Sequence, residues 1–537
     1  ASAEVAPDAL AACAAAGASV LRAKDDDCEA FLLALAAEQR RRHPEWLVVG
    51  VTGSVGKTTT KDMLRAGFGA VRCTHATAGN LNNLIGMPLT LLAAPEDSEV
   101  VVCELGMNHP GEISRLAGAC SPALACVTTI GTSHIGILGS RENIARAKAE
   151  VCAQMRDSGA GAGDVARTLV MPSACYLTPY IADGFARPAG VAVELVGTRE
   201  GDAVRACDVR LDEEGLPSFT VSCADGWSRE VTLNLPGRKV VDDFLIALAL
   251  IWRAGADRDA ATDAIERMEH TALRLDVRAS AAGVRVIDDS YNAAPNSMAS
   301  SLDILATMAC EGRRVAVLGQ MGELGAEEEK LHGYTGAYAA AKGLDMLVFI
   351  GGHLADVMAD AARASGLPVL FSVQGVMRDC AAHLCDGVPE KYRRSAALWH
   401  AIDKIIPGEL LDNMQANFDA LAAKEAAVLA DARYVTGRTA FDRAACAVLA
   451  PHARYYPCNE TLRPLFYTGT LWHARDFAAA PVLLLPQGNY PLKNLHTVIK
   501  ALPAVLAEYG NAELRIAGWP PLDKGPLLRP VIDRMFP

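Results

Sequence analysis

Residues Val48 to Thr60, VVGVTGSVGKTTT, have the types and the order that a phosphate-binding turn requires. An apolar strand is expected to lead into a glycine-rich turn, and the helix that opens at Lys57 would point its amide groups at an anion. Lys57 would reach the β- and γ-phosphates of a nucleoside triphosphate, and the Thr58 hydroxyl would bind Mg²⁺. The strict spacing asks for glycine at position 51, where this chain has Val51. We still predict nucleotide binding by Thr52, Gly53, Ser54, Val55, Gly56, Lys57, Thr58 and Thr59.

The segments around this turn alternate as a parallel sheet with crossover helices does. The apolar runs LVVGV, VVVCELG and LACVTTIG are separated by helix-length segments between Trp46 and about Cys126. Glu104 ends the second run, at the carboxyl end of a predicted strand, where α/β proteins bind ligands and where a carboxylate could hold Mg²⁺. A more polar, β-rich stretch and an Ala/Leu-rich helix at residues 242–254 follow. A second α/β unit begins near Val284.

Length and composition limit the classes of protein that this chain can be. With 537 residues it is too long for one core, so at least three domains are expected. Its formal net charge of −12 argues against a nucleic-acid-binding surface. The 15 cysteines form no C-x-x-C pair and no zinc-type spacing, which is typical of a protein from a reducing cytosol. No apolar run is long enough for a membrane span, so we expect a cytoplasmic protein.

Six motifs, in order along the chain, identify residues 47–385 as similar to the Mur ligase family. The resemblance is to the members that add D-alanyl-D-alanine to UDP-N-acetylmuramoyl-tripeptide in peptidoglycan synthesis. The motifs that carry it are VTGSVGKTTTKDML (51–64), AGNLNNLIGMPLTLL (78–92), CELGMNHPGEIS (103–114), TTIGTSHIGILGSRENIARAKAEV (128–151), IDDSYNAAPNSM (287–298) and VAVLGQMGELG (315–325).

The resemblance implies an ATP-dependent amide-bond ligase that works through an acyl phosphate. The γ-phosphoryl group of ATP would pass to the terminal carboxylate of the tripeptide, and the amine of D-alanyl-D-alanine would then displace phosphate. Because two anions must approach each other, such a reaction needs metal ions and cationic side chains. The substrates UDP-N-acetylmuramoyl-tripeptide and D-alanyl-D-alanine are therefore the expected partners, ATP and Mg²⁺ the expected cofactors, and a monomer the expected state.

The resemblance also implies roles for particular residues. The expected catalytic residues are Lys57, Glu104, His134 and Lys148, and the expected Mg²⁺ ligands are Thr58, Glu104, His134 and Lys148. Lys148 would be carbamylated, which turns a cation into a carboxylate-like ligand. Further contacts to the nucleotide or substrate are expected from Asn80, Asn83, Arg274, Asp289, Tyr291 and Asn292. Taken singly, each has a plainer interpretation, since asparagines often form turns and isolated lysines usually lie at the surface.

The chain departs from the family pattern at several positions. Gly237-Arg238-Lys239-Val240 replaces the usual G-R-H-N, Ala294 replaces an asparagine, and Gln320 replaces an aspartate. Residues 1–46 are about half as long as the expected UDP-sugar-binding domain, so we expect a truncated remnant there. The family's terminal strand motif, expected near residue 390, is absent. These departures leave open a second interpretation, a non-catalytic ATP-binding relic.

The last third of the chain resembles a different family. Residues 389–431 have the pattern of a long amphipathic helix, which we predict to be a linker. Residues 432–537 resemble part of a GT-B glycosyltransferase, in which Lys493 would reach a donor diphosphate and Asn489 would lie nearby. A glycosyltransferase that uses a nucleotide-sugar donor is therefore the alternative function.

The predicted fold class is α/β with five parts. A P-loop Mur-ligase central domain at 47–272 follows the remnant at 1–46 and precedes a Rossmann-like C-terminal ligase domain at 273–388. The helical linker at 389–431 and the partial GT-B-like α/β segment at 432–537 complete the chain.

Overall fold

A computed structural model describes residues 15–17, 23, 27–158, 164–268, 274–280, 283–364, 369–372, 380–382, 411–458, 482–485, 495–510 and 512–516. The chain divides into two compact units, one of Ala1–Leu347 with Gly351–Leu367 and the other of Val348–Ile350 with Pro368–Pro537. In the described part of the chain, no helix has the length and apolar character needed to cross a bilayer. The finer five-part division stays a prediction.

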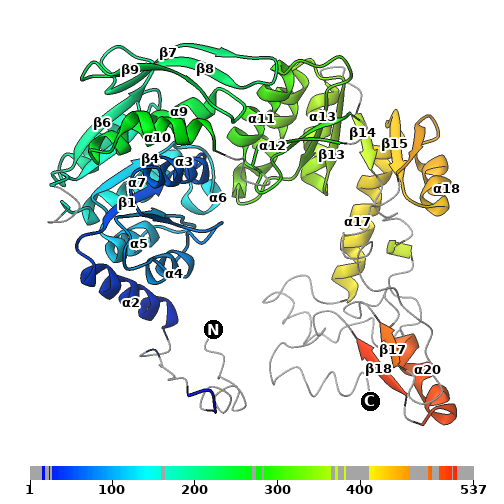
Figure 1. Ribbon diagram of the computed structural model, residues 1–537. Coiled ribbons are helices and arrows are strands. Elements are labelled where there is room, and N and C mark those ends of the chain that lie inside the picture. The colour runs from blue at the N-terminus through cyan, green and yellow to red at the C-terminus, as the bar shows by residue number, and fades with distance from the viewer. Residues whose placement is uncertain are drawn as a thin grey trace. The chain divides into compact units, whose positions relative to one another are not determined.

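The first unit contains a nine-stranded sheet in the order β2-β3-β1-β4-β5-β6-β7-β8-β9 (Figure 1). Strands β2 to β7 run parallel to their neighbours, and β7, β8 and β9 are antiparallel. The strands are β1 (Leu47–Thr52), β2 (Thr74–Ala76), β3 (Val100–Glu104), β4 (Leu124–Val127), β5 (Thr168–Pro172), β6 (Ala192–Gly197), β7 (Val204–Leu211), β8 (Pro217–Cys223) and β9 (Ser228–Thr232). The predicted parallel sheet is thus confirmed.

Helices cover both faces of the parallel strands, so the residues of β1, β3 and β4 are all buried. One core includes side chains from α2, α4, α5, α7 and α8, and the core on the other face includes side chains from α3, α9 and α10. The helices are α2 (Cys28–Arg42), α3 (Lys57–Gly69), α4 (Gly86–Leu92), α5 (Glu112–Cys120), α6 (Ile135–Leu138), α7 (Arg141–Ala149), η2 (Glu150–Gln154), α8 (Thr178–Ile181), η3 (Ala182–Ala186), α9 (Lys239–Arg253) and α10 (Arg258–Glu266).

The register of the central strands brings their carboxyl ends to one edge of the sheet. In β1, Val51 pairs with Glu104 of β3, and Thr52 pairs with Val127 of β4. The loops that leave these three strands therefore begin side by side. That arrangement, and not closeness in sequence, brings together the turn after Thr52 and the carboxylate of Glu104.

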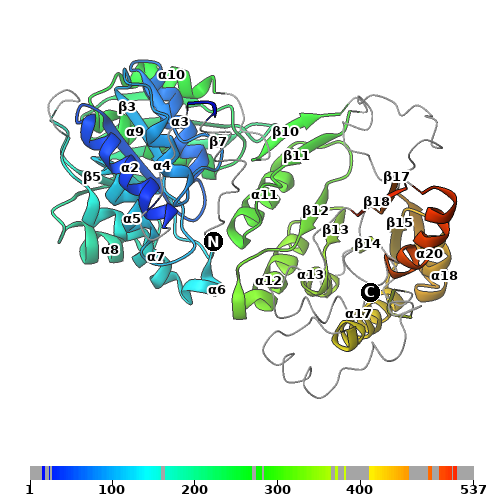
Figure 2. The same ribbon diagram turned by 90° about the horizontal axis from the view of Figure 1, so that it is seen from below.

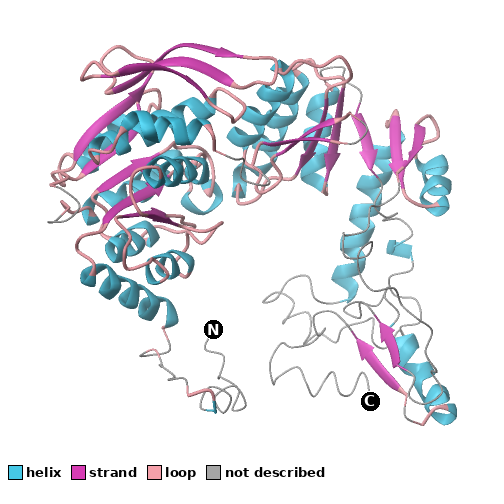
Figure 3. Cartoon of the chain, viewed as in Figure 1, coloured by secondary structure: helices cyan, strands magenta, loops and turns pink. Residues whose placement is uncertain are grey.

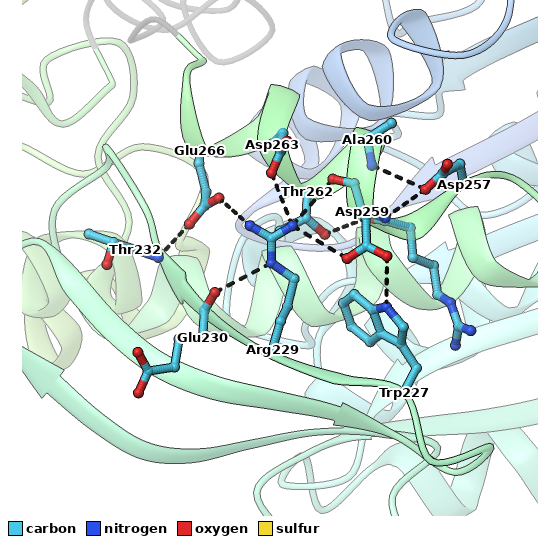
Figure 4. A network of polar contacts seen from close by, with 11 residues as sticks. Trp227, Arg229, Glu230, Thr232, Asp257, Asp259, Ala260, Thr262, Asp263 and Glu266 are labelled. Carbon is cyan, nitrogen blue, oxygen red and sulfur yellow. Dashed lines mark hydrogen bonds and ion pairs between the residues drawn. The ribbon is translucent and has the colours of Figure 1, made fainter.

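The antiparallel end of this sheet, whose strands are magenta in Figure 3, is fastened to α10 by a polar network around Arg229 of β9 (Figure 4). Its guanidinium pairs with Asp263 at 3.0 Å and with Glu266 at 2.9 Å. Glu266 also accepts a hydrogen bond from the Thr232 amide at 2.8 Å, and the indole of Trp227 donates to Asp259 at 3.2 Å. These contacts join two elements that the chain connects only through α9.

The rest of the first unit, together with residues 348–350 of β13, is a second α/β lobe (Figure 2). An antiparallel hairpin of β10 and β11 precedes three helices and two further strands. The elements are β10 (Asp276–Ala279), β11 (Arg285–Asp288), α11 (Pro295–Thr307), β12 (Val315–Gly319), η4 (Gly325–Glu327), α12 (Glu328–Ala340), β13 (Met346–Ile350) and α13 (His353–Arg363). The expected second α/β unit near Val284 is confirmed. We call residues 274–364 the C-terminal lobe.

The second unit contains parallel strands in the order β14-β15-β16, and a separate parallel pair of β17 and β18. Its elements are β14 (Val369–Ser372), α17 (Leu411–Ala430), β15 (Tyr434–Gly437), α18 (Ala440–Leu449), β16 (Arg454–Pro457), β17 (Val482–Leu485), α20 (Leu495–Glu508) and β18 (Glu513–Ile516). Most of the predicted linker before α17, together with Asn489 and Lys493, lies outside the described residues. The likeness to GT-B enzymes stays a prediction.

Candidate active site

The turn between β1 and α3 requires glycine at two positions. Gly53 has a φ of +148° and Gly56 a φ of +92°, which L side chains rarely adopt. A Cβ on Gly53 would overlap the Thr128 hydroxyl, and one on Gly56 would overlap the carboxyl of Asp243. The turn is also tied to the segment after β4, because the Ser54 amide donates to the Thr129 carbonyl at 2.8 Å. The predicted strand, turn and helix are confirmed.

Thr52 and Val55, at the two ends of this turn, contact Thr128 through their backbone carbonyls. The carbonyl of Thr52 accepts from the Thr128 amide at 2.9 Å, and the carbonyl of Val55 accepts from the Thr128 hydroxyl at 2.5 Å. Thr59 is half-buried in the first turn of α3. These hydrogen bonds hold the loop through its carbonyl groups, so amides of the turn can face an anion.

Lys57, the first residue of α3, folds over the turn. Its Nζ donates to the carbonyl of Gly53 at 2.9 Å and lies 3.5 Å from that of Ser54. Burial lowers the pKa of Lys57, the Glu104 carboxylate opposes this shift, and the charge of Arg274 adds to it. The ammonium is thus held at the turn, and its predicted contact with the phosphates stays a prediction.

Glu104 and Thr58 lie together at the carboxyl edge of the sheet. The Thr58 hydroxyl donates to Glu104 Oε2 at 3.2 Å, and the side-chain amide of Asn82 donates to Oε1 at 2.8 Å. The Glu104 amide donates to the Thr77 hydroxyl at 3.0 Å. Glu104 is 1% exposed, so its carboxylate is held by fixed partners inside the protein.

The Thr58–Glu104 pair fits a nucleotide-bound Mg²⁺. Both residues offer oxygen, and Mg²⁺ in phosphoryl-transfer sites takes one or two protein carboxylates with phosphates and waters as its other ligands. Among the described residues, no three His, Cys, Asp or Glu side chains are grouped to hold a metal ion. A fuller ligand set would therefore need the hydroxyl of Thr58 and a modified Lys148.

Lys148, on α7, is an almost fully buried amine, with 2% of its surface exposed. Burial lowers the pKa of Lys148 well below its usual range, and the charge of Lys57 adds to this effect. A neutral amine is the form that attacks CO₂ to give a carbamate, so the environment of Lys148 suits the modification that the family resemblance implies.

His134 lies just before α6 and faces the C-terminal lobe. Its Nδ1 is 2.5 Å from Oε2 of Glu323, in the loop after β12. Burial lowers the pKa of His134, Glu323 opposes the shift, and Lys148 and Lys57 add to it. Lys148 and Lys57 therefore lie close enough to His134 to act on it electrostatically, and both favour its neutral form.

The asparagine loop before α4 differs in detail from the prediction. Asn80 is exposed, and Asn83 uses its Oδ1 to accept from the amides of Ile85 at 3.1 Å and Gly86 at 2.8 Å. Asn83 therefore holds the turn that leads into α4. Asn82, which the sequence analysis did not select, is the asparagine that contacts Glu104. Roles of Asn80 and Asn83 toward a ligand stay predictions.

The predicted residues of the C-terminal lobe gather at its first hairpin. The Arg274 guanidinium lies 4.2 Å from the centre of the Tyr291 ring. Asp289 accepts from the Leu275 amide at 3.3 Å and from the Ser301 hydroxyl at 2.6 Å, and burial raises its pKa. Because Arg274 also acts electrostatically on Lys57, this hairpin lies near the phosphate-binding turn.

The structure gives the positions of Asn292 and of three residues at which the chain departs from the family pattern. The Asn292 Oδ1 accepts from the amide of Ala293 at 2.9 Å. Lys239 is exposed, Val240 is buried in the core, and Ala294 is the N-cap residue of α11. A ligand contact by Asn292 therefore stays a prediction.

Two family models match this part of the chain. The model described as Mur ligase middle domain matches residues 51–251, and the one described as Mur ligase, glutamate ligase domain matches residues 273–388. The UDP-N-acetylmuramoyl-tripeptide–D-alanyl-D-alanine ligase of Escherichia coli is 33% identical over 321 residues, which cover 59% of this chain and 67% of that protein. The chain belongs to the Mur ligase family.

Other Mur ligases give a consistent comparison. The ligase of the same name from Bacillus subtilis is 34% identical over 317 residues, covering 59% of this chain and 65% of the relative. The one from Mycobacterium bovis is 34% identical over 312 residues, covering 57% of this chain and 58% of the relative. The match to these two Mur ligases thus spans less than two thirds of their length.

Solved Mur ligase structures share the fold. The crystal structure of MurF from Acinetobacter baumannii matches with a TM-score of 0.59 and 27% identity, covering 74% of this chain and 81% of that chain. MurF from Thermotoga maritima, solved in complex with ADP, matches with a TM-score of 0.54 and 24% identity, covering 67% of this chain and 78% of that chain. The predicted Mur-ligase fold of the central and C-terminal ligase domains is confirmed.

Proposed function

We propose that this protein is an ATP-dependent ligase that joins UDP-N-acetylmuramoyl-tripeptide to D-alanyl-D-alanine through an acyl phosphate. The relatives that carry this name support the choice of substrates. The observation that carries the proposal is the cluster at the carboxyl edge of the sheet. There Lys57 lies over a glycine turn, and Thr58 contacts the buried carboxylate of Glu104.

In this proposal the turn and Lys57 bind the triphosphate of ATP. Amides of residues 55–58 would donate to the phosphate oxygens, and Lys57 would neutralise charge on the β- and γ-phosphates. Mg²⁺, held through Thr58 and Glu104, would supply further charge neutralisation when it is bound. Asn82 orients Glu104 by its hydrogen bond to Oε1.

The second half of the proposed site receives the carboxylate substrate. His134 and a carbamylated Lys148 would complete the ligand set for a second Mg²⁺, as the family resemblance implies. Arg274 would face the phosphates from the C-terminal lobe, since its charge already acts on Lys57. The reaction belongs in the cytoplasm in this proposal, because ATP and nucleotide-linked precursors are cytoplasmic metabolites.

The glycosyltransferase alternative is not favoured. The matched family domains cover residues 51–251 and 273–388, which hold all of the proposed site. Lys493, on which a donor-binding role would depend, lies outside the described residues. The choice that remains for experiment is between a working ligase and an ATP-binding relic.

Phosphate release from Mg-ATP tests the proposal. We expect release that requires both UDP-N-acetylmuramoyl-tripeptide and D-alanyl-D-alanine, and we expect Lys57→Ala to lower it by about 10²-fold or more, as loss of one charge-stabilising donor does elsewhere. Mass spectrometry of the product would identify the new amide. ATP binding with no release that depends on the substrates would identify a relic and contradict the proposed function.

A further inference from the structure

The loop between β12 and α12 makes two adjacent contacts with the central α/β region. The carboxylate of Glu323 pairs with Nδ1 of His134 at 2.5 Å. The carbonyl of the same residue accepts a hydrogen bond from the amide of Gly136 at 3.0 Å. One residue of the C-terminal lobe thus binds both a side chain and a backbone amide in the loop that holds His134.

The loop that presents Glu323 is anchored on both sides. Met321 is 3% exposed and Leu324 is 2% exposed, so the chain enters the core just before and just after Glu323. His332 of α12 is fully buried and accepts a hydrogen bond from the Met321 amide at its Nε2, at 2.9 Å. Its Nδ1 then carries the proton and donates to the carbonyl of Glu328 at 2.6 Å. Glu323 is therefore held in place by its neighbours.

Close backbone packing fixes where the two loops meet. A Cβ on Gly325 would lie 2.5 Å from Cα of Gly136, and a Cβ on Gly136 would overlap the Gly325 backbone. His134 and Glu323 both have a φ of +63°, a left-handed conformation that is uncommon outside glycine. Two such residues that face each other indicate a contact held by the structure around it.

We propose that Glu323 is a positioning residue for the metal site: it holds His134 by Nδ1 and so leaves Nε2 as the atom that binds Mg²⁺. This inference rests on the proposed function, in which His134 is a metal ligand. A neutral imidazole with its proton on Nδ1, the nitrogen beside the carboxylate, has its lone pair on Nε2, on the opposite side of the ring. Because Glu323 belongs to the C-terminal lobe, that lobe would help set the geometry of a ligand in the central domain.

The exposure of the pair separates this role from a stabilising one. The side chain of Glu323 is 50% exposed and that of His134 is 21% exposed. Exposed ion pairs contribute little to stability. Removing the carboxylate should therefore leave the melting temperature unchanged and weaken metal binding. If the contact were merely structural, its removal would change neither quantity, or would lower the melting temperature and the metal affinity together.

The test measures binding of Mn²⁺ with adenylyl imidodiphosphate, a non-hydrolysable ATP analogue, by the electron paramagnetic resonance signal of free Mn²⁺. We expect Glu323→Ala to weaken Mn²⁺ binding by about 10-fold or more, the usual effect of losing an outer partner of a ligating histidine. Glu323→Gln keeps an acceptor for Nδ1–H, so its loss should be smaller. Thermal unfolding of each variant is measured in parallel.

Glu329→Gln is the matched control. Glu329 pairs with Nε2 of His353 at 2.8 Å, also in the C-terminal lobe, and its side chain is 67% exposed. This variant loses the same charge from the same kind of pair and should bind Mn²⁺ as the wild type does.

Each outcome decides between the two proposals. Wild-type affinity in Glu323→Ala, or equal losses in Glu323→Gln and Glu329→Gln, would overturn the role of Glu323 and leave the proposed function standing. If Glu323→Ala does not fold, a loss in Glu323→Gln greater than in Glu329→Gln supports the role. A wild-type protein that bound no Mn²⁺ with the analogue would contradict both proposals.

Discussion

Asp243 of α9 places a carboxyl group next to Gly56 of the phosphate-binding turn. Its Oδ1 accepts from the Thr60 hydroxyl at 3.2 Å, and its carboxyl occupies the space that a side chain at Gly56 would need. Burial raises the pKa of Asp243 well above the usual range, the charge of Asp242 adds to this, and Thr60 opposes it. The folded protein therefore favours the protonated form.

Asp243→Asn should stabilise the protein at neutral pH. Because the pKa is higher in the folded state than in the unfolded one, the folded state loses stability as pH rises through the folded pKa. The amide cannot ionise and can still accept from Thr60, so the difference in melting temperature should be near zero in acid and grow toward pH 8. The melting temperature is expected to rise by about 2–4 °C for each kcal/mol by which the free energy of unfolding increases. Thermal scans across pH measure it.

Asp225→Asn is the control, because its effect on the melting temperature at neutral pH should have the opposite sign. A hydrogen bond from Arg258 lowers the pKa of Asp225, so its carboxylate contributes stability that is present at neutral pH and lost as pH falls through the folded pKa. This variant should melt below the wild type at pH 7 and approach it in acid. The same sign for both variants would contradict the account of Asp243.

Residue types allow the phosphate-binding turn to be predicted because its chemistry is local. Gly53, Gly56 and Lys57 lie within one short stretch of the sequence and need only one strand and one helix to aim them. Asn82 could not be chosen over Asn80 and Asn83 in the same way, since the turn geometry decides which of the three faces Glu104. A sequence motif includes Glu323, but nothing local predicts that it meets His134.

At the scale of elements, Arg229 of β9 provides the ion pairs with α10, and we call these ion pairs the clamp. Arg229 is 24% exposed and pairs with carboxylates on two successive turns of α10. We expect Arg229→Ala to lower the free energy of unfolding by about 1–2 kcal/mol, because several partly buried partners lose their cation together. Denaturant unfolding gives this value, and hydrogen exchange should rise at residues 228–232.

Arg41→Ala is the comparison for this clamp. Arg41 pairs with Glu38 on the exposed side of α2, where its side chain is 74% exposed. A change within about 0.5 kcal/mol is expected there. An equal or greater loss in Arg41→Ala would show that the network around Arg229 does not act as a clamp.

Patterns along the chain predict the elements better than their pairing. Unbroken apolar runs such as LVVGV and VVVCE indicated buried parallel strands, and the polar runs from residue 192 onward indicated strands β6 to β9. That β7 pairs with β6, and so extends the same sheet, could not be predicted. Strand pairing depends on contacts between distant segments, which alternation within a segment does not specify.

At the scale of the whole molecule, every residue of the proposed site lies in the first compact unit. A chain that ends at residue 388 should therefore bind Mg-ATP with an affinity within about twofold of the full chain, since every residue proposed to contact the nucleotide lies before residue 347. Isothermal titration of both chains measures this. A loss of tenfold or more would mean that residues after 388 contribute to nucleotide binding.

The pairing of β14 with β15 has a consequence for solubility. Residues 369–372 lie within the matched ligase domain and residues 434–437 lie after it, and the two strands form one parallel ladder. Without β15, the free amides and carbonyls of β14 would offer a template to any other chain with an unpaired strand. The segment that contains β15 thus shields an edge against self-association, a task that requires no catalytic residue of its own.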